Sequence, residues 1–217
     1  MKNKFALSGI SGLMFILWIV IIKNVDVAAI GPDGTSVGLS GINEAVHDLF
    51  GVNMLWYKIT VCLGIFAFAC VGAVALIGLF QLVKRKSIAK VDKCIIAAGG
   101  LYVVTACIYV LFEKIIINYR PVIMPDADEP EASFPSTHTM IICVVMGSIV
   151  VLVGQYIKEK NLKRLTVIIS IAIAVVTVGG RLISGVHWFS DIIGGILVSL
   201  FLVFLYAGIV EKANKQS

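Results

Sequence analysis

The chain has 217 residues, of which 59% are hydrophobic and 14% are charged, and its mean hydropathy is +0.99. This composition excludes a soluble globular domain of ordinary composition. The formal net charge of +5 indicates membrane topology and no nucleic-acid partner, because nucleic-acid binding would need a basic face on a soluble domain.

Six apolar runs follow one another along the chain and predict six transmembrane helices. Most of them reach the roughly 18–20 residues that a helix needs to cross the hydrocarbon core. The fifth run is the shortest, and we expect its helix to include Gly179, Gly180 and flanking residues. The runs are Phe5–Ile22, Trp56–Val83, Cys94–Phe112, Met140–Ile157, Leu165–Val178 and Ile192–Val210. The predicted fold class is all-α integral membrane, with residues 1–217 forming a single membrane-embedded domain.

The first apolar run has two interpretations. Lys2 and Lys4 precede it, and Val27-Ala28-Ala29 follows, as in a cleavable signal peptide. However, the run is longer than the roughly 7–15 residues usual for a signal-peptide core, and Lys23 follows it directly. We therefore expect a retained first helix.

The connection from Lys23 to Leu55 predicts a short amphipathic helix, with Ser40 as its N-cap. At helical spacing, one side of this helix would carry the apolar residues and the opposite side the polar ones. The apolar residues are Ile42, Ala45, Val46, Leu49 and Phe50, and the polar residues are Asn43, Glu44, His47 and Asp48. Such a helix fits the outer membrane interface. A helix that covers the spans is favoured over one that guides a lipid substrate, and His47 is expected to be a solvated surface residue.

The basic residues predict the orientation of the spans. Of the 18 lysines and arginines, all but five fall on one side of an alternating six-span arrangement. The five on the other side are Lys23, Lys58, Lys114, Arg120 and Arg181. Because cytoplasmic loops carry the excess of Lys and Arg, both termini are expected to be cytoplasmic.

Two groups of possible metal ligands are explained more simply in other ways. The five cysteines fall within the predicted spans without metal-ligand spacing, and we expect them to act as small apolar residues. Asp126, Asp128, Glu129 and Glu131 could bind Ca²⁺ or Mg²⁺. An irregular external loop that is free to carry acidic residues is the favoured interpretation, so no metal site is predicted.

Three polar segments border the external ends of the spans and predict one pocket. Arg120-Pro121 follows the third span, Pro135-Ser136-Thr137-His138 begins the fourth, and Arg181, His187 and Asp191 bracket the turn between the last two. Arginine forks and a helix N-terminus suit phosphate oxygens, and two histidines can divide nucleophilic and acid roles. Asp191, four residues after His187, is expected to reach it across one helical turn and fix its tautomer.

These residues resemble the type 2 phosphatidic acid phosphatases, a family of membrane lipid phosphate phosphatases. The family signature has three parts: a lysine separated by six residues from Arg-Pro, then Pro-Ser-Gly-His, then Ser-Arg-x5-His-x3-Asp. Here Arg120-Pro121 ends the first part, Pro135-Ser136-Thr137-His138 forms the second, and Gly180-Arg181-x5-His187-x3-Asp191 forms the third with its spacing kept.

The resemblance implies a phosphate transfer in two steps that needs no metal and no cofactor. His187 would attack phosphorus with Asp191 polarising it, and His138 would protonate the leaving oxygen and later activate water. The phosphoryl oxygens would be held by Arg120, Arg181, Ser136, the backbone N–H of Thr137, and Lys114.

Three positions depart from the family signature. Thr137 replaces a glycine but keeps its backbone N–H, and Gly180 replaces a serine and so removes a hydroxyl. Lys114 stands one residue out of register, with Glu113 at the usual lysine position. One residue turns a helical side chain by about 100°, so Lys114 must use its length or a local bulge to reach a phosphate.

The favoured hypothesis is an integral-membrane lipid phosphatase of a bacterial plasma membrane, working at the extracytoplasmic face among membrane lipids. Its substrate would be a polyprenyl diphosphate, phosphatidylglycerol phosphate or phosphatidic acid. The alternatives are a catalytically inactive relative and a lipid transporter or scramblase. A transporter usually has polar groups near the midplane of its spans, whereas the charges here gather at the surfaces. Motif spacing selects neither a lipid nor an oligomeric state.

Overall fold

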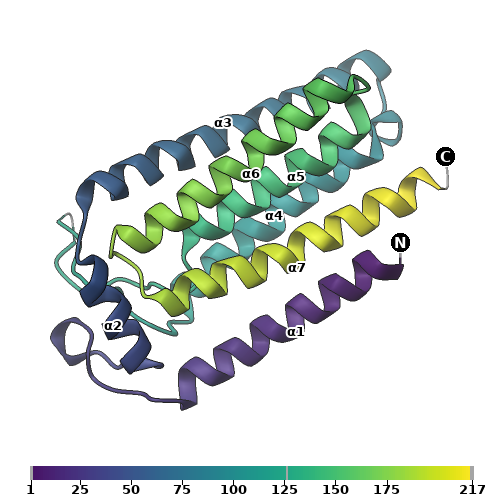
Figure 1. Cartoon of the computed structure of the whole chain (residues 1–217). Helices are drawn as coiled ribbons and strands as arrows, with labels where there is room; N and C mark the ends of the chain where they lie inside the picture. The colour runs from purple at the N-terminus through teal and green to yellow at the C-terminus, as the bar shows by residue number, and fades with distance from the viewer. Residues whose placement is uncertain (1, 126, 216–217) are drawn as a thin grey trace.

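The computed structural model describes residues 2–125 and 127–215, and most of them form six long helices (Figure 1). The six are α1 (Lys2–Asn24), α3 (Met54–Arg85), α4 (Lys93–Lys114), α5 (Thr137–Tyr156), α6 (Lys160–Ile183) and α7 (Phe189–Asn214). Each is long and apolar enough to cross a membrane. The predicted six spans are therefore confirmed. The fifth span extends as expected, because α6 continues through Gly179 and Gly180 to Ile183.

The helix α5 lies at the centre of the bundle. It packs against α3, α4, α6 and α7, and Met140 and Val144 on its inner side contact a buried cluster that includes Val198 and Leu202 of α7. The outer helices keep large apolar side chains exposed, for example Leu13 at 59%, Phe68 at 62% and Val175 at 64%. Such a surface suits a lipid environment.

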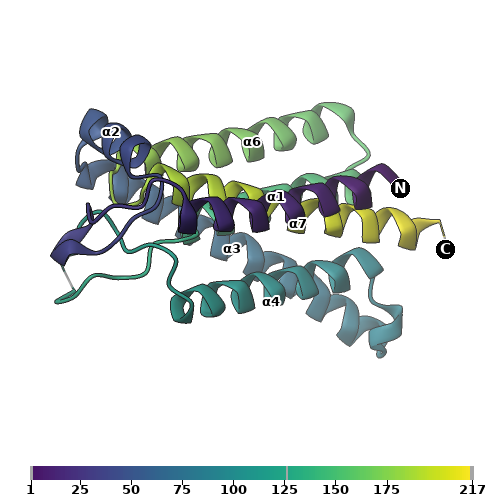
Figure 2. The same cartoon turned by 90° about the horizontal axis from the view of Figure 1, so that it is seen from below.

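Both chain termini lie at one end of the bundle, and α2 (Ser40–Phe50) lies at the other (Figures 1 and 2). The connection between α3 and α4, with its short 3₁₀ helix η2 (Ile88–Lys90), is at the end with the termini (Figure 2). The 3₁₀ helix η1 (Pro32–Gly34) belongs to the connection between α1 and α2. The bundle therefore has a terminal end and an α2 end, and these two names are kept below.

The helix α1 packs along α7. Gly12 allows this approach, because a Cβ there would lie 3.1 Å from a ring carbon of Phe201. The hydroxyl of Ser8 donates to the carbonyl of Phe201 at 2.9 Å, and Nε1 of Trp18 donates to the carbonyl of Ser190 at 2.9 Å. The first helix is thus an integral part of the bundle.

The short helix α2 forms where it was predicted, but Ser40 is not its N-cap. Leu39 precedes the helix in a left-handed conformation, and the carboxylate of Asp26 accepts from the Ser40 hydroxyl at 2.9 Å and from the Gly41 N–H at 2.7 Å. These two bonds lower the pKa of Asp26, with the Gly41 bond contributing most.

The side of α2 that carries Asn43 and His47 faces the protein, and most of its other residues, including Glu44 and Asp48, are exposed. Asn43 is fully buried, whereas Ile42 is 48% and Leu49 74% exposed. His47 is half-buried, and its ring centroid lies 5.6 Å from that of Trp188. The expectation that His47 is a solvated surface residue is therefore wrong, because α2 packs the side that carries Asn43 and His47 against the start of α7.

Candidate active site

His187 lies in the tight turn between α6 and α7, at the α2 end of the bundle, and is only 4% exposed. Gly185 in this turn has a φ of 65°, and a Cβ there would lie 1.9 Å from the carbonyl oxygen of Gly51. The N–H of Asn53 donates to the carbonyl of Ser184 at 3.1 Å. The turn is therefore held against the connection between α2 and α3.

Asp191 is fully buried in the first turn of α7, and its carboxylate accepts hydrogen bonds from three groups. Its Oδ2 accepts from the Trp188 N–H at 3.0 Å and from the Ser133 hydroxyl at 2.6 Å. Its Oδ1 accepts from Nδ2 of Asn118 at 3.1 Å. The bond from Trp188 caps the N-terminus of α7.

The predicted direct contact between Asp191 and His187 is replaced by a contact through Ser133. His187 precedes α7, which begins at Phe189, so the two side chains are not on successive turns of one helix. The Ser133 hydroxyl lies 3.0 Å from Nδ1 of His187. Sequence reasoning missed both Ser133 and Asn118. The sequence signal for them was their position, because Ser133 lies just before Pro135-Ser136 and Asn118 lies just before Arg120-Pro121.

The start of α5 adds Ser136, Thr137 and His138 to the cluster. Ser136 is the N-cap of α5, and its N–H donates to the carbonyl of Asp191 at 3.0 Å, which ties the start of α5 to that of α7. Its buried hydroxyl has no hydrogen-bond partner among the described residues. Thr137 begins the helix, where the first-turn N–H groups have no helical partners. Gly64 of α3 leaves room for His138, since a Cβ there would lie 3.2 Å from its Cδ2.

Two arginines reach the cluster from different elements. Arg181 in the last turn of α6 is fully buried, with its Cζ 5.0 Å from the ring centroid of Tyr57. Its Nε and one terminal nitrogen have no hydrogen-bond partner in the part of the chain that the structure describes. Arg120 pairs through Nε with Oε2 of Glu131 at 3.1 Å. One of its terminal nitrogens is also buried without a partner among those residues.

The pKa of His187 lies well below its usual 6.5. Burial is the largest cause, followed by the positive charges of Arg120 and Arg181 and by His138. At neutral pH the imidazole is uncharged, and its Nε2 is buried and without a partner among the described residues. Unpaired cationic donors around a neutral imidazole can bind an anion and present it to a nucleophile.

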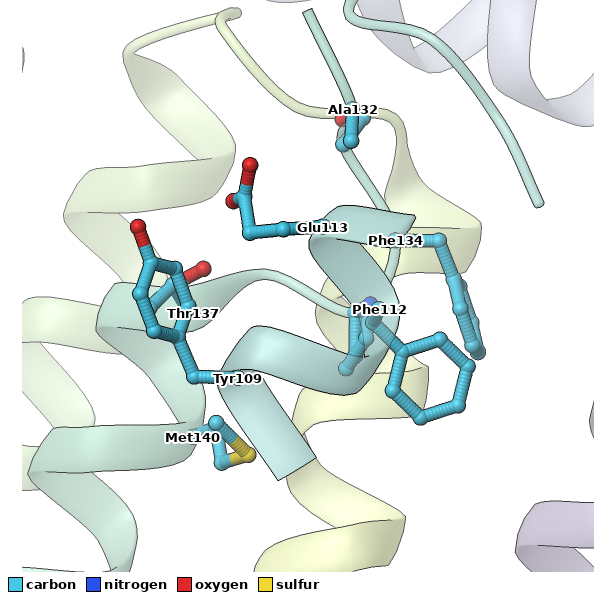
Figure 3. Close-up of a pocket in the computed structure, with 9 residues that line it drawn as sticks. Tyr109, Phe112, Glu113, Ala132, Phe134, Thr137 and Met140 are labelled. Carbon is cyan, nitrogen blue, oxygen red and sulfur yellow. The ribbon is translucent and has the colours of Figure 1, made fainter. Parts of the chain in front are cut away.

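The predicted contact of Lys114 with phosphate stays a prediction. Lys114 is exposed at the C-terminal end of α4, and no hydrogen bond or ion pair joins its side chain to another described residue. Glu113 instead lines a small pocket between α4 and α5, together with Tyr109, Thr137 and Ser133 (Figure 3). Through Thr137 and Ser133 this pocket adjoins the candidate active site.

The departure at Gly180 has a packing reason. A Cβ at Gly180 would lie 2.7 Å from Cγ2 of Thr60 and 2.9 Å from Cε3 of Trp56. Because α6 approaches α3 this closely, a serine would not fit without a shift of these side chains or of a helix.

The acidic connection before α5 contributes an ion pair. Glu131 is engaged by Arg120, and Asp126 lies outside the described residues. Among residues 2–125 and 127–215, no group of three or more histidine, cysteine or carboxylate side chains is placed to hold a metal ion.

Comparison with known proteins identifies the family. The model of the PAP2 superfamily matches residues 94–215, more than half of the chain. The chain belongs to the PAP2 superfamily. The region that matches this family includes α4–α7 and the residues gathered around His187, which confirms the resemblance based on the motifs.

Comparisons of sequence and of structure both find matches from Bacillus subtilis. Phosphatidylglycerophosphatase B of strain 168 is 33% identical over 102 residues, which are 46% of this chain and 50% of that protein. The match thus spans half the length of that relative. The crystal structure of the first transmembrane PAP2 type phosphatidylglycerolphosphate phosphatase aligns over 98% of both chains, with a TM-score of 0.64 and 23% identity. This likeness shows that the two share a fold.

Proposed function

We propose that this protein is an integral-membrane lipid phosphatase that hydrolyses a lipid phosphate monoester or diphosphate through a phosphohistidine intermediate. The observation that carries the proposal is the set of buried, unpaired donors of Arg120, Arg181 and Ser136 at the end of the bundle that holds His187. A buried guanidinium without a counter-ion is costly, so an anion that enters this site is strongly stabilised. A phosphate group has the charge and the oxygens that these donors need.

In the first step, Nε2 of His187 forms a bond to phosphorus as the bond from phosphorus to the leaving oxygen breaks. His138 gives that oxygen a proton, so a monoester leaves as a lipid alcohol and a diphosphate as a lipid monophosphate. The two arginines, Ser136 and the N–H of Thr137 stabilise the charge that builds on the phosphoryl oxygens.

In the second step, His138 takes a proton from water as the water oxygen bonds to phosphorus. The bond between phosphorus and Nε2 breaks, inorganic phosphate leaves, and both histidines return to their starting states. Both steps use side chains of this protein for acid–base work and charge stabilisation, so we expect turnover without an added metal ion.

The substrate tail can remain in the bilayer while its phosphate enters the α2 end of the bundle. Phosphatidylglycerol phosphate is the first lipid to test, because a relative that is 33% identical is named a phosphatidylglycerophosphatase. Phosphatidic acid and a polyprenyl diphosphate offer the same chemistry. The excess of lysine and arginine at the terminal end supports an extracytoplasmic site in a bacterial plasma membrane.

The test is release of inorganic phosphate by the purified full chain in detergent, in the presence of EDTA, from each of these three lipids. We expect His187→Ala to lower turnover by at least about a thousandfold. The control, His47→Ala, changes a histidine outside the cluster, and we expect it to stay within about fivefold of wild type. Equal inactivity of wild type and His187→Ala on every lipid would refute the proposal.

The side of the membrane is tested by a matched pair of cysteine variants in a cysteine-free background. Asp128→Cys lies in the connection between α4 and α5, and Lys86→Cys lies in the connection between α3 and α4. A membrane-impermeant maleimide should label the first in intact cells and the second only after permeabilisation. The reverse pattern would place the site on the cytoplasmic face.

A further inference from the structure

Ser133 lies between the two residues that the mechanism needs to act together. It is 2% exposed, and its Oγ lies 2.6 Å from Oδ2 of Asp191, to which it donates, and 3.0 Å from Nδ1 of His187. We propose that Ser133 is a positioning residue whose hydroxyl carries the effect of Asp191 to His187 and keeps the imidazole proton on Nδ1. This inference rests on the proposed function, since it concerns how the nucleophile of that reaction is prepared.

A count of protons leads to this assignment. A serine hydroxyl has one hydrogen, and here that hydrogen goes to Asp191. Oδ1 and Oδ2 of Asp191 also accept from Asn118 and from the Trp188 N–H, so both oxygens act as acceptors. The contact between Ser133 and His187 therefore requires Nδ1 to be the donor. The lone pair of the neutral ring is then on Nε2, which is buried and has no hydrogen-bond partner among the described residues.

The opposite arrangement would disable the nucleophile. With a proton on Asp191, the Ser133 hydroxyl would donate to Nδ1, and the ring proton would be on Nε2. Nε2 would then have no lone pair with which to attack phosphorus. The state of the Asp191–Ser133–His187 chain thus decides which nitrogen can react.

The same series of hydrogen bonds, from Asp191 through Ser133 to His187, stabilises the positive charge that develops on the ring during the attack. As Nε2 bonds to phosphorus, positive charge builds on the imidazole ring. The Nδ1–H group donates to a hydroxyl that Asp191 already polarises, so the carboxylate acts on the ring without a direct contact. The proton remains on Nδ1 throughout, as the balance of the two steps requires.

Ser133 is held in place by the segment that also positions Arg120. The N–H of Ser133 donates to the carbonyl of Asn118 at 2.9 Å, and the N–H of Arg120 donates to the carbonyl of Glu131 at 3.0 Å. Tyr119 and Ala132 form an antiparallel bridge between these bonds. One short backbone pairing therefore fixes both the serine hydroxyl and a phosphate-binding arginine.

The kinetic test uses Ser133→Ala with Ser199→Ala as its control. Ser199 is also 2% exposed, and its hydroxyl donates only to the backbone carbonyls of Met140 and Gly195. We expect Ser133→Ala to lower kcat by roughly 10- to 100-fold with KM for the lipid within about twofold, because the hydroxyl acts on the chemical step. Ser199→Ala should keep kcat within about twofold, and Ser133→Thr, which retains the hydroxyl, should recover most of the lost turnover.

A double variant tests whether Ser133 and Asp191 act on turnover through one series of hydrogen bonds or independently of each other. If Ser133 acts through Asp191, then Ser133→Ala combined with Asp191→Asn should be no more than about twofold slower than Asp191→Asn alone. Losses that multiply would overturn the proposal. A kcat of Ser133→Ala within twofold of wild type would do the same.

A spectroscopic readout is independent of turnover. In the full chain labelled with ¹⁵N-histidine, the His187 resonances should show a protonated Nδ1 and an unprotonated Nε2, and Ser133→Ala should give a mixture of both tautomers. A wild-type protein with its proton on Nε2 would overturn the inference. A wild type that releases no phosphate from any lipid would instead refute the proposed function, and the spectrum would still decide the role of Ser133.

Discussion

Each end of the bundle brings an arginine together with acidic and polar side chains, but the two clusters satisfy their hydrogen bonds differently. At the terminal end, Asp92 accepts from Arg85 at 2.6 Å, from Gln81 at 2.8 Å and from the Tyr156 hydroxyl at 2.6 Å. The N–H of Asp92 donates to Oε1 of Gln81 at 2.9 Å. At the α2 end, Arg181 is fully buried and two of its nitrogens have no partner among the described residues.

We therefore interpret the cluster at the terminal end as one that stabilises the fold and the cluster at the α2 end as one that binds a ligand. The bonds at Asp92 join α3 and α5 to the start of α4 and lower the pKa of its carboxyl, with Tyr156 contributing most and Arg85 next. The unpaired donors at the other end stabilise nothing until an anion arrives, and their burial costs free energy in its absence. Substitutions at the two ends should therefore affect stability and turnover in opposite ways.

Among the substitutions that compare the two ends, the largest effect is expected from Arg181→Met, which removes the buried charge and keeps much of the side-chain volume. Turnover should fall by about 100- to 1000-fold, because a donor to the transition state is lost. The melting temperature in the absence of substrate should stay the same or rise, since an unpaired buried charge has been removed. Phosphate release and thermal unfolding check the two parts.

Arg164→Met is the matched control, because Arg164 is exposed near the opposite end of the same helix. It should leave turnover unchanged within about twofold. A drop in melting temperature for Arg181→Met with normal turnover would reverse the comparison between the two ends.

A smaller effect on turnover is expected from Gly180→Ser, which restores the residue of the family signature. Overpacking against Thr60 and Trp56 should cost about 1–3 kcal/mol of stability and displace Arg181 on the same helix. We expect turnover to fall by roughly tenfold. Gain of activity on adding the serine hydroxyl would show that α6 and α3 separate more easily than their packing indicates.

Asp92→Asn should change stability while leaving turnover unaltered. Loss of the charged acceptor should destabilise the protein by about 1–2 kcal/mol at pH 7, where the wild-type carboxyl is ionised. Because the pKa of Asp92 is lowered in the folded state, its contribution is present above the ordinary value of 3.8 and is lost as the pH falls through the folded-state pKa. Unfolding curves of both proteins should therefore converge at acidic pH. A constant difference at every pH would mean that the charge of Asp92 is not what stabilises this end.

The smallest effect is expected from Lys114→Ala. Its exposed side chain has no bond to the described residues of the site, so turnover should change by less than about twofold. A loss of tenfold or more would mean that Lys114 reaches the phosphate once substrate binds. The α2 end would then include a third cation.

Much of the fold was predictable because long apolar runs leave a membrane chain few choices. All six spans formed, and the weak fifth run extended through Gly179 and Gly180 to Ile183. The orientation of α2 was not predictable from its pattern, because an amphipathic helix beside a bilayer can turn its apolar side to lipid. Asn43 and His47 consequently face the protein.

The candidate site was predictable as far as its residues belong to spaced motifs. Arg181, His187 and Asp191 meet His138, Arg120 and Ser136 at one end of the bundle. The role of Ser133 could not be read from spacing, because it depends on His187 lying just before the first turn of α7. The reason for a glycine at position 180 in place of the family's serine could not be predicted either. It lies in the close packing of α6 against α3, which a local sequence pattern does not show.

The central claim is that His187 carries the phosphoryl group during turnover. The most direct measurement is rapid quenching of the full chain during hydrolysis of a lipid labelled with ³²P in its terminal phosphate. We predict one acid-labile, alkali-stable phosphoryl group per active chain, located on His187 by peptide mapping and missing in His187→Ala. Normal phosphate release with no label on His187, or with label on another residue, would contradict the account.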